Sequence, residues 1–260
     1  MTGIPYDWLE GLLVLLGASV LLVLVVVISV IKNMGIAREM LLAVLKGGGQ
    51  LLAIALFLTF LFGFDQWYFL IWLLLGTMVA VSGHTAARRA ADMPGAFQVT
   101  TPAILAGAAA ALVVLAFSRA MPLHPQFIVP LAGMAFGNSM KICSLSLERL
   151  MREVRANRTA IETALSLGAT SRQALEEYGK ISVKASLIPT IDSLKTLGII
   201  FIPGAMAGLL IAGTDPLVAA EYQIIVYLMI VGGGIISSLL ASTLSRPKLF
   251  TAAEQLQPWV

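Results

Sequence analysis

The chain has 260 residues, of which 58% are hydrophobic and only 12% are charged, and its mean hydropathy is +0.92. One soluble core cannot bury so much apolar surface, so the composition excludes an ordinary soluble protein and indicates one embedded in a lipid bilayer. Backbone polar groups in lipid must bond within their own segment, which predicts an all-α fold. The net charge of +3 gives no reason to expect a nucleic-acid partner.

A helix needs about 20 mostly apolar residues to cross a hydrocarbon layer roughly 30 Å thick. Seven stretches meet this requirement and predict a polytopic integral membrane helix bundle with seven transmembrane helices, forming a single transmembrane domain over residues 1–260. The first stretch lacks a preceding Lys or Arg and a clear cleavage site, so we expect it to remain as a helix. The stretches are Leu12–Ile31, Gly47–Phe64, Trp67–Ser82, Pro102–Ser118, Phe127–Leu147, Ile188–Ala212 and Tyr222–Leu244.

Positive charges report the orientation of these helices, because cytoplasmic loops carry an excess of Lys and Arg. In this chain nearly all of them fall in alternate connections or in the tail, and only Arg119 falls on the opposite side. The pattern predicts an external amino terminus and a cytoplasmic carboxyl terminus. The residues on the predicted cytoplasmic side are Lys32, Arg38, Lys46, Arg88, Arg89, Arg149, Arg152, Arg155, Arg158, Arg172, Lys180, Lys184, Arg246 and Lys248.

The longest connection, residues 148–187, lies on the predicted cytoplasmic side. Glu148 and Arg152 are four residues apart, a spacing that favours continuation of the fifth helix into water. Thr159–Leu167 then has a helical composition, and Gly168 is suited to end such a helix in the left-handed conformation.

A second short helix is predicted directly after this one. Thr170 and Gln173 match a capping box, and the helix Arg172–Tyr178 is expected to end at Gly179. The prediction is therefore two short helices that meet at a compact corner, residues 168–170. An amphipathic hairpin that lies on the membrane surface is the alternative.

Polar side chains within the spans are costly to bury and are candidates for a translocation path. Asp192 and Lys195 can pair at the predicted start of the sixth helix, where the carboxylate would meet the positive end of the helix dipole. A structural anchor is the alternative role for this pair. The candidates are Gln50, Asn138, Ser139, Lys141, Asp192 and Lys195.

Met134, Met140 and Met206 complete the translocation candidates, because thioethers bind soft metal ions. Methionine in a helix more often packs than coordinates. Oxygen ligands for ferric iron are nearly absent from the spans, and the single Cys143 offers no metal-ligand spacing. The sequence leaves a metal site unknown.

Small residues four positions apart allow helices to approach closely in lipid. Gly133 with Gly137 and Gly204 with Gly208 have this spacing. They predict that the fifth and sixth helices make close contacts.

The sequence contains no GxxxxGK[ST] phosphate loop, so if ATP drives this protein, another polypeptide binds the nucleotide. A secondary transporter that works without an ATPase is the alternative, although the spans supply almost none of the protonatable groups it needs. The last span has no lysine for retinal, and no nucleophile elbow of a serine protease occurs. We expect a transport subunit rather than an enzyme.

Several ordered phrases in the second half of the chain resemble known transporters. The phrase ETALSLG (Glu162–Gly168) is similar to the opening of the cytoplasmic signature of ABC importer permeases, with Thr163 where Ala is usual. A denser series resembles the FetB-type permease family, in which Met is frequent at the position of Ala205. That series is PLAGMAFGNSM (130–140), LSLGATSRQA (165–174), SLIPTIDSLKTLG (186–198), PGAMAGLLIAGTDP (203–216) and AAEYQIIV (219–226).

The resemblance implies a permease subunit of an ABC transporter in the bacterial plasma (inner) membrane that exports iron or another metal. The family is also related to plant aluminium-tolerance transporter subunits. The resemblance further implies a second copy of the chain and a separate cytoplasmic ABC ATPase that binds ATP and Mg, so that this chain itself binds no cofactor. The ATPase-coupling residues would be Glu162, Leu167, Gly168, Ala169, Thr170 and Gln173.

Overall fold

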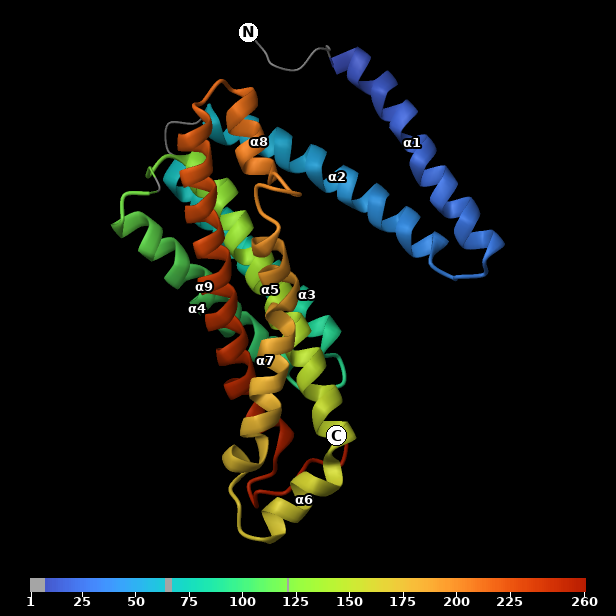
Figure 1. Ribbon diagram of the computed structural model, residues 1–260, viewed down its shortest axis with the longest axis vertical. Coiled ribbons are helices and arrows are strands. Elements are labelled where there is room, and N and C mark those ends of the chain that lie inside the picture. The colour runs from blue at the N-terminus through green and yellow to red at the C-terminus, as the bar shows by residue number, and fades with distance from the viewer. Residues whose placement is uncertain (1–7, 64–66, 121) are drawn as a thin grey trace. The chain divides into compact units, whose positions relative to one another are not determined.

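The computed structural model describes residues 8–63, 67–120 and 122–260. These residues form nine α-helices, and their only β pairings are two isolated bridges. The helices divide into two compact units, with the division at residues 67 and 68 (Figure 1). The prediction of an all-α protein is confirmed for the described residues.

The first unit contains α1 (Trp8–Ile31) and α2 (Ala37–Phe62), which contact each other. Asn33 and Gly35 in the turn between them have φ angles of 49° and 70°, the left-handed region that reverses a chain. Most of the described side chains of α1 are exposed, Leu16 by 67% for example, as a lipid-facing helix requires. The predicted start of the second span at Gly47 is wrong, because the helix begins ten residues earlier and includes the charged residues before the glycine run. Its predicted end, Phe64, lies outside the described residues.

The second unit is built around α9 (Pro216–Leu249), which packs against α4 (Ala96–Phe117), α5 (Pro125–Ala156) and α7 (Ser171–Lys195). Small residues allow the closest approaches, since a Cβ at Gly234 would lie 2.2 Å from Ile142 of α5. The helix α3 (Trp67–Arg89) is joined to α4 by a hydrogen bond of 2.8 Å from Thr100 Oγ1 to the carbonyl oxygen of Gly83.

The sixth predicted span, Ile188–Ala212, is wrong as a continuous helix. Residues 171–195 form α7, the next eight residues are irregular, and α8 covers Gly204–Ile211. Gly198 has a φ of 80°, and its N–H donates to the carbonyl oxygen of Phe201 over 2.9 Å, which closes a turn instead of a helix. Pro203, with an extended ψ of 152°, then sets the start of α8. Hydropathy alone did not register this interruption.

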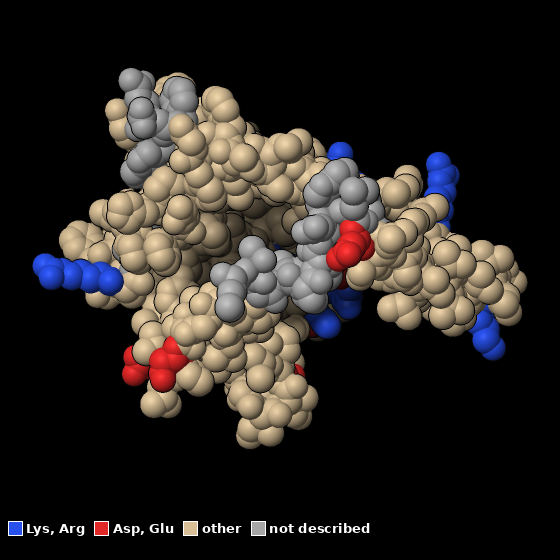
Figure 2. Space-filling view, turned by 90° about the horizontal axis from the view of Figure 1, so that it is seen from above, with Lys and Arg blue, Asp and Glu red and all other residues tan. Residues whose placement is uncertain are grey.

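Six of the described helices, α1 to α5 and α9, are long and apolar enough to cross a membrane. They correspond to the predicted spans other than the sixth. Most of the surface seen in Figure 2 also consists of uncharged residues. The polytopic membrane fold is therefore confirmed for the described part of the chain.

The predicted glycine pairs do not make the close contacts inside one chain. Gly137, Gly204 and Gly208 have no described heavy atom within 4 Å of the position of a Cβ, and Gly133 has only the end of the Met78 side chain at 3.9 Å. A spacing of four residues between glycines indicates a smooth helix face, but it does not indicate which helix packs against that face. A role of these faces against a second copy stays a prediction.

Candidate functional site

The connection between α5 and α7 forms a sharp corner at the end of the second unit opposite α8 (Figure 1). α5 continues to Ala156 and carries the predicted ion pair of Glu148 with Arg152 at 2.9 Å. The short helix α6 (Arg158–Ser166) follows and is stabilised by an ion pair of 2.8 Å between Arg158 and Glu162. The predicted short helix is confirmed.

The two sides of the corner are each closed by local hydrogen bonds. Gly168 has a φ of 92°, and its N–H donates to the carbonyl oxygen of Leu165, so α6 ends as predicted. Thr170 and Gln173 form the predicted capping box at the start of α7. Leu167 at the tip is 83% exposed. The corner is thus locally ordered and presents an apolar side chain outward.

The predicted end of the second helix at Gly179 is wrong, because α7 continues to Lys195. Gly179 is buried, and a Cβ there would lie 2.9 Å from Ser242 Oγ of α9. The glycine therefore serves a close helix contact and does not end the helix. One continuous helix joins the corner to the middle of the unit.

The last residues of the chain fold back against the corner. The Arg158 guanidinium donates to the carbonyl oxygen of Val260 over 2.8 Å, and the Ser171 N–H donates to the Glu254 carboxylate. Leu256 in this segment is buried. These contacts join residues 102 and 83 positions apart in the sequence, so local patterns could not predict them. They brace both helices of the corner.

A second feature is a pocket of about 420 Å³ between α5, α7 and α9. Its polar lining includes Asn138 and Lys141 of α5 and Tyr227 of α9. Asn138 also donates to the carbonyl oxygen of Met134 over 2.9 Å. The pocket has no carboxylate among its lining residues, and hydroxyl groups supply the rest of its polar surface. The α7 residues with these groups are Ser186, Thr190 and Ser193.

Most of the other predicted path residues lie outside this pocket. Ser139 is 1% exposed, and its hydroxyl has no hydrogen-bond partner among the described residues. Met134 and Met140 pack against the apolar core. Gln50 is exposed on α2 in the first unit. Asn138 and Lys141 are the predicted candidates that line the pocket.

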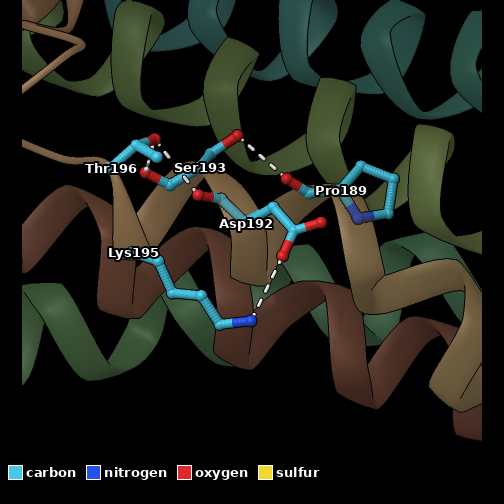
Figure 3. Close-up of polar contacts among 5 residues, drawn as sticks. All are labelled: Pro189, Asp192, Ser193, Lys195 and Thr196. Carbon is cyan, nitrogen blue, oxygen red and sulfur yellow. Dashed lines mark hydrogen bonds and ion pairs between the residues drawn. The ribbon is translucent and has the colours of Figure 1, made fainter.

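Asp192 and Lys195 form the predicted ion pair at 3.2 Å (Figure 3). They lie in the last turn of α7 and not in the first turn of a helix, so the predicted contact of the carboxylate with a positive helix end is wrong. At this end of the helix the lysine is the residue that the dipole favours. Both side chains are more than half exposed, which fits an anchor at the end of the helix.

Gln223 of α9 was not among the predicted functional residues. This side chain is 3% exposed, and its carbonyl oxygen accepts a hydrogen bond of 3.2 Å from the N–H of Met206 in the first turn of α8. A glutamine in the middle of an apolar run was the available signal. The hydrogen bond from Met206 to Gln223 attaches the short helix α8 to α9.

Within the described part of the chain, no group of three or more His, Cys, Asp or Glu side chains could hold a metal ion. Met134, Met140 and Met206 do not line the pocket either.

These features define an all-helical, multi-pass integral membrane protein with a braced helical corner. The model of the uncharacterised protein family UPF0014 matches residues 12–250, and the chain belongs to this family. No solved structure matches the chain at a significant level.

Several relatives are similar over nearly the whole chain. The UPF0014 membrane protein STAR2 of Oryza sativa is 37% identical over 98% of this chain and 90% of its own length. Protein ALUMINUM SENSITIVE 3 of Arabidopsis thaliana is 36% identical, with 98% and 94% coverage. The "Probable iron export permease protein FetB" of Escherichia coli is 32% identical, with 92% coverage of each chain. The recognised resemblance is confirmed.

Proposed function

We propose that this chain is the membrane-spanning permease subunit of an ATP-driven ABC transporter whose ATPase is a separate polypeptide. The observation that carries the proposal is the exposed corner at residues 167–170, closed on both sides by local hydrogen bonds. A partner can move α7 directly through this corner because α7 is one continuous helix, and it can move α5 through the short helix α6, which begins two residues after α5 ends. The similarity to a protein named as a permease supports the same role.

The proposed ATPase contact comprises the corner and the adjoining turns of α6 and α7. Gly168 has open space where a Cβ would stand, so a partner surface can approach its backbone. Gln173 and Glu162 are engaged in the cap and in an ion pair, which fixes the helices beside the contact. ATP and Mg would bind to the ATPase, and this chain would hold neither.

The proposed topology has seven crossings, the sixth of them interrupted. α9 has 34 residues and is about 51 Å long. α7 with 25 residues and α8 with 8 add up to about 50 Å in the opposite direction. The α7–α8 segment and α9 begin and end near each other. At one end, Ser171 of α7 contacts Glu254 just beyond α9. At the other end, α9 starts a few residues after α8. These lengths support the proposal that the α7–α8 segment crosses the same bilayer as α9.

Interrupted helices are a recurrent feature of transporter binding sites. The pocket beside the end of α7 is lined partly by Phe201 of the irregular segment. We place the translocation path there, with Asn138 and Lys141 as its first polar contacts. The other candidates, including Ser139 and Met206, then support the surrounding helices.

The named function of the bacterial relative leads us to propose iron or another metal as the exported species. The described pocket lacks carboxylates, so an exported metal would pass as a complex whose oxygen atoms meet amide, hydroxyl and ammonium groups. We further propose a plasma-membrane location with the amino terminus outside, and an assembly with a second copy, because closed twofold assemblies are the usual solution.

The decisive experiment compares ATP hydrolysis and metal efflux with and without a candidate ABC ATPase. The proposal predicts that the purified chain has no ATPase activity, that it co-purifies with the ATPase, and that efflux requires an ATPase able to hydrolyse ATP. Efflux that persists in cells lacking every such ATPase would instead support a secondary transporter.

A further inference from the structure

A groove of about 520 Å³ runs between the first half of α7 and the last turns of α9. The two helices are antiparallel and meet where Gly179 faces Ser242. Counting along each helix from this contact places Arg172 and Arg246 toward one end of the groove. Val183 and Leu239 lie toward the other end.

The end with the two arginines carries uncompensated positive charge. Neither Arg172 nor Arg246 forms an ion pair with a carboxylate among the described residues. Glu176 in the groove is bound to Lys180 at 2.6 Å. The hydrogen bond from Lys180 lowers the pKa of Glu176, and Arg172 adds a weaker attraction, so this carboxylate stays ionised and paired at neutral pH.

The same two arginines also line a neighbouring pocket of about 610 Å³ that reaches the chain's last segment. Glu254 in that pocket accepts the N–H of Ser171, so part of its charge is already engaged at the start of α7. The arginines therefore lie at the junction of two open spaces, and the carboxylate in each space is already engaged by another group, Glu176 by Lys180 and Glu254 by Ser171.

The opposite end of the groove lies where the surface becomes apolar. Ile181 and Ile188 of α7 are 43% and 51% exposed, and Leu239 of α9 is 51% exposed. Most of the charged side chains in the first half of α7 precede this level, and Lys184 lies at its edge. The groove thus crosses from a charged zone to a lipid-facing zone, with the hydroxyl groups of Ser242 and Thr243 between them.

We propose that this groove binds an anionic phospholipid, with the headgroup phosphate at Arg172 and Arg246 and an acyl chain along Val183 and Leu239. Guanidinium groups bind phosphate oxygens in a bidentate manner. A basic pocket between helices at a membrane boundary is a recognised site for lipid headgroups. The apolar wall distinguishes a lipid from a free phosphate, which has nothing to place there. The proposal is independent of the transported species.

The test uses the full chain in mild detergent and native mass spectrometry with phosphatidylglycerol or phosphatidylcholine of identical acyl chains. We expect the parent to retain phosphatidylglycerol about tenfold better than phosphatidylcholine. The double variant Arg172→Gln with Arg246→Gln should bind both lipids equally. Arg149→Gln removes the same kind of charge from an exposed position of α5 outside the groove and should behave as the parent.

A second variant is needed in case the double arginine variant misfolds, since misfolding alone would also change lipid binding. Thr243→Glu introduces a negative charge at an exposed position of the groove and should also lower the retention of phosphatidylglycerol. Unchanged lipid preference in both groove variants would overturn the proposal. Displacement of the lipid by an equal concentration of glycerol phosphate would identify a free-phosphate site instead. Loss of ATPase binding with unchanged lipid preference would identify a protein contact.

Discussion

A Cβ atom on Gly107 of α4 would lie 2.3 Å from the carbonyl oxygen of Gly233 in α9 and 2.0 Å from Ser237 Oγ. The two backbones can therefore approach at this point only because position 107 has no side chain. In lipid, where no hydrophobic effect drives one helix toward another, such close packing carries much of the association.

Gly107→Ala should lower the stability of the second unit by about 1–3 kcal/mol, the usual cost of overpacking, because the backbone at Gly233 cannot move aside. The midpoint of thermal unfolding in detergent, followed by size-exclusion chromatography, measures the effect. Gly232→Ala is the matched control, since nothing lies within 4 Å of its Cβ position. Equal midpoints for the two variants would contradict the packing described for α4 and α9.

Gln223→Leu should loosen α8 without unfolding the bundle. The variant leaves the N–H of Met206 without its partner, at a cost of about 1 kcal/mol. Amide hydrogen exchange in residues 204–211 should then be about fivefold faster. Gln50→Leu on the exposed face of α2 is the control and should leave this exchange unchanged. Protection of α8 equal to that of the parent would mean that other contacts hold the short helix.

The interrupted crossing can be tested by labelling single cysteines from outside the cell. The natural Cys143 is buried, so its background reaction should be low. We expect an impermeant maleimide to label Thr214→Cys but not Ser166→Cys until the membrane is opened. Tags after Val260 and before Gly3 should be cytoplasmic and external, respectively; Gly3 lies outside the described residues. Labelling of both cysteines from the same side would contradict the seven-crossing proposal.

Asn138→Leu should reduce transport strongly while leaving assembly unchanged, because it replaces a polar group of the pocket with an apolar one of similar size. Lys141→Met tests the adjoining ammonium group in the same way. Efflux measured at equal amounts of protein in the membrane gives the result. Thr196→Val, at the end of α7 and outside the pocket lining, should transport normally. Normal efflux by both pocket variants would move the path elsewhere.

The local features of this protein could be predicted from its sequence, and the long-range ones could not. The capping box at Thr170 and the left-handed Gly168 depend on neighbours within a few residues, so the pattern contains all the necessary information. Gly179 was misinterpreted because the same residue type both ends helices and permits close contacts. Only the partner, Ser242 of α9, decides between these roles.

The candidate site shows the same division. Residues 188–212 are mostly apolar, so the turn at Gly198 lay hidden within a stretch long enough to be predicted as a span. The pocket and the brace by Glu254 depend on which helices lie side by side, which no single segment encodes. The ion pair of Asp192 with Lys195 was predictable from spacing, but its place at the end of the helix was not.

The last prediction concerns the corner. Ala169→Glu should leave membrane insertion unchanged and weaken coupling to the ATPase. Ala169 is half-buried between the exposed Leu167 and the capping residue Thr170, so a longer, charged side chain must project into the space that the proposed ATPase occupies. The N–H of Ala169 already donates to the carbonyl oxygen of Ala164, and the substitution leaves this bond intact. The variant should therefore fold and insert normally.

We expect Ala169→Glu to lose ATPase binding or transport-coupled ATP hydrolysis by at least about tenfold, the effect of burying one unpaired charge at an interface. Co-purification and hydrolysis in membranes measure the two quantities separately. Thr214→Glu makes the same change in the loop between α8 and α9, at the other end of the unit, and should have little effect. If Ala169→Glu binds the ATPase and transports as the parent does, the corner is not the coupling contact. It is then a membrane-surface hairpin, and the force from ATP hydrolysis must enter the bundle through another segment.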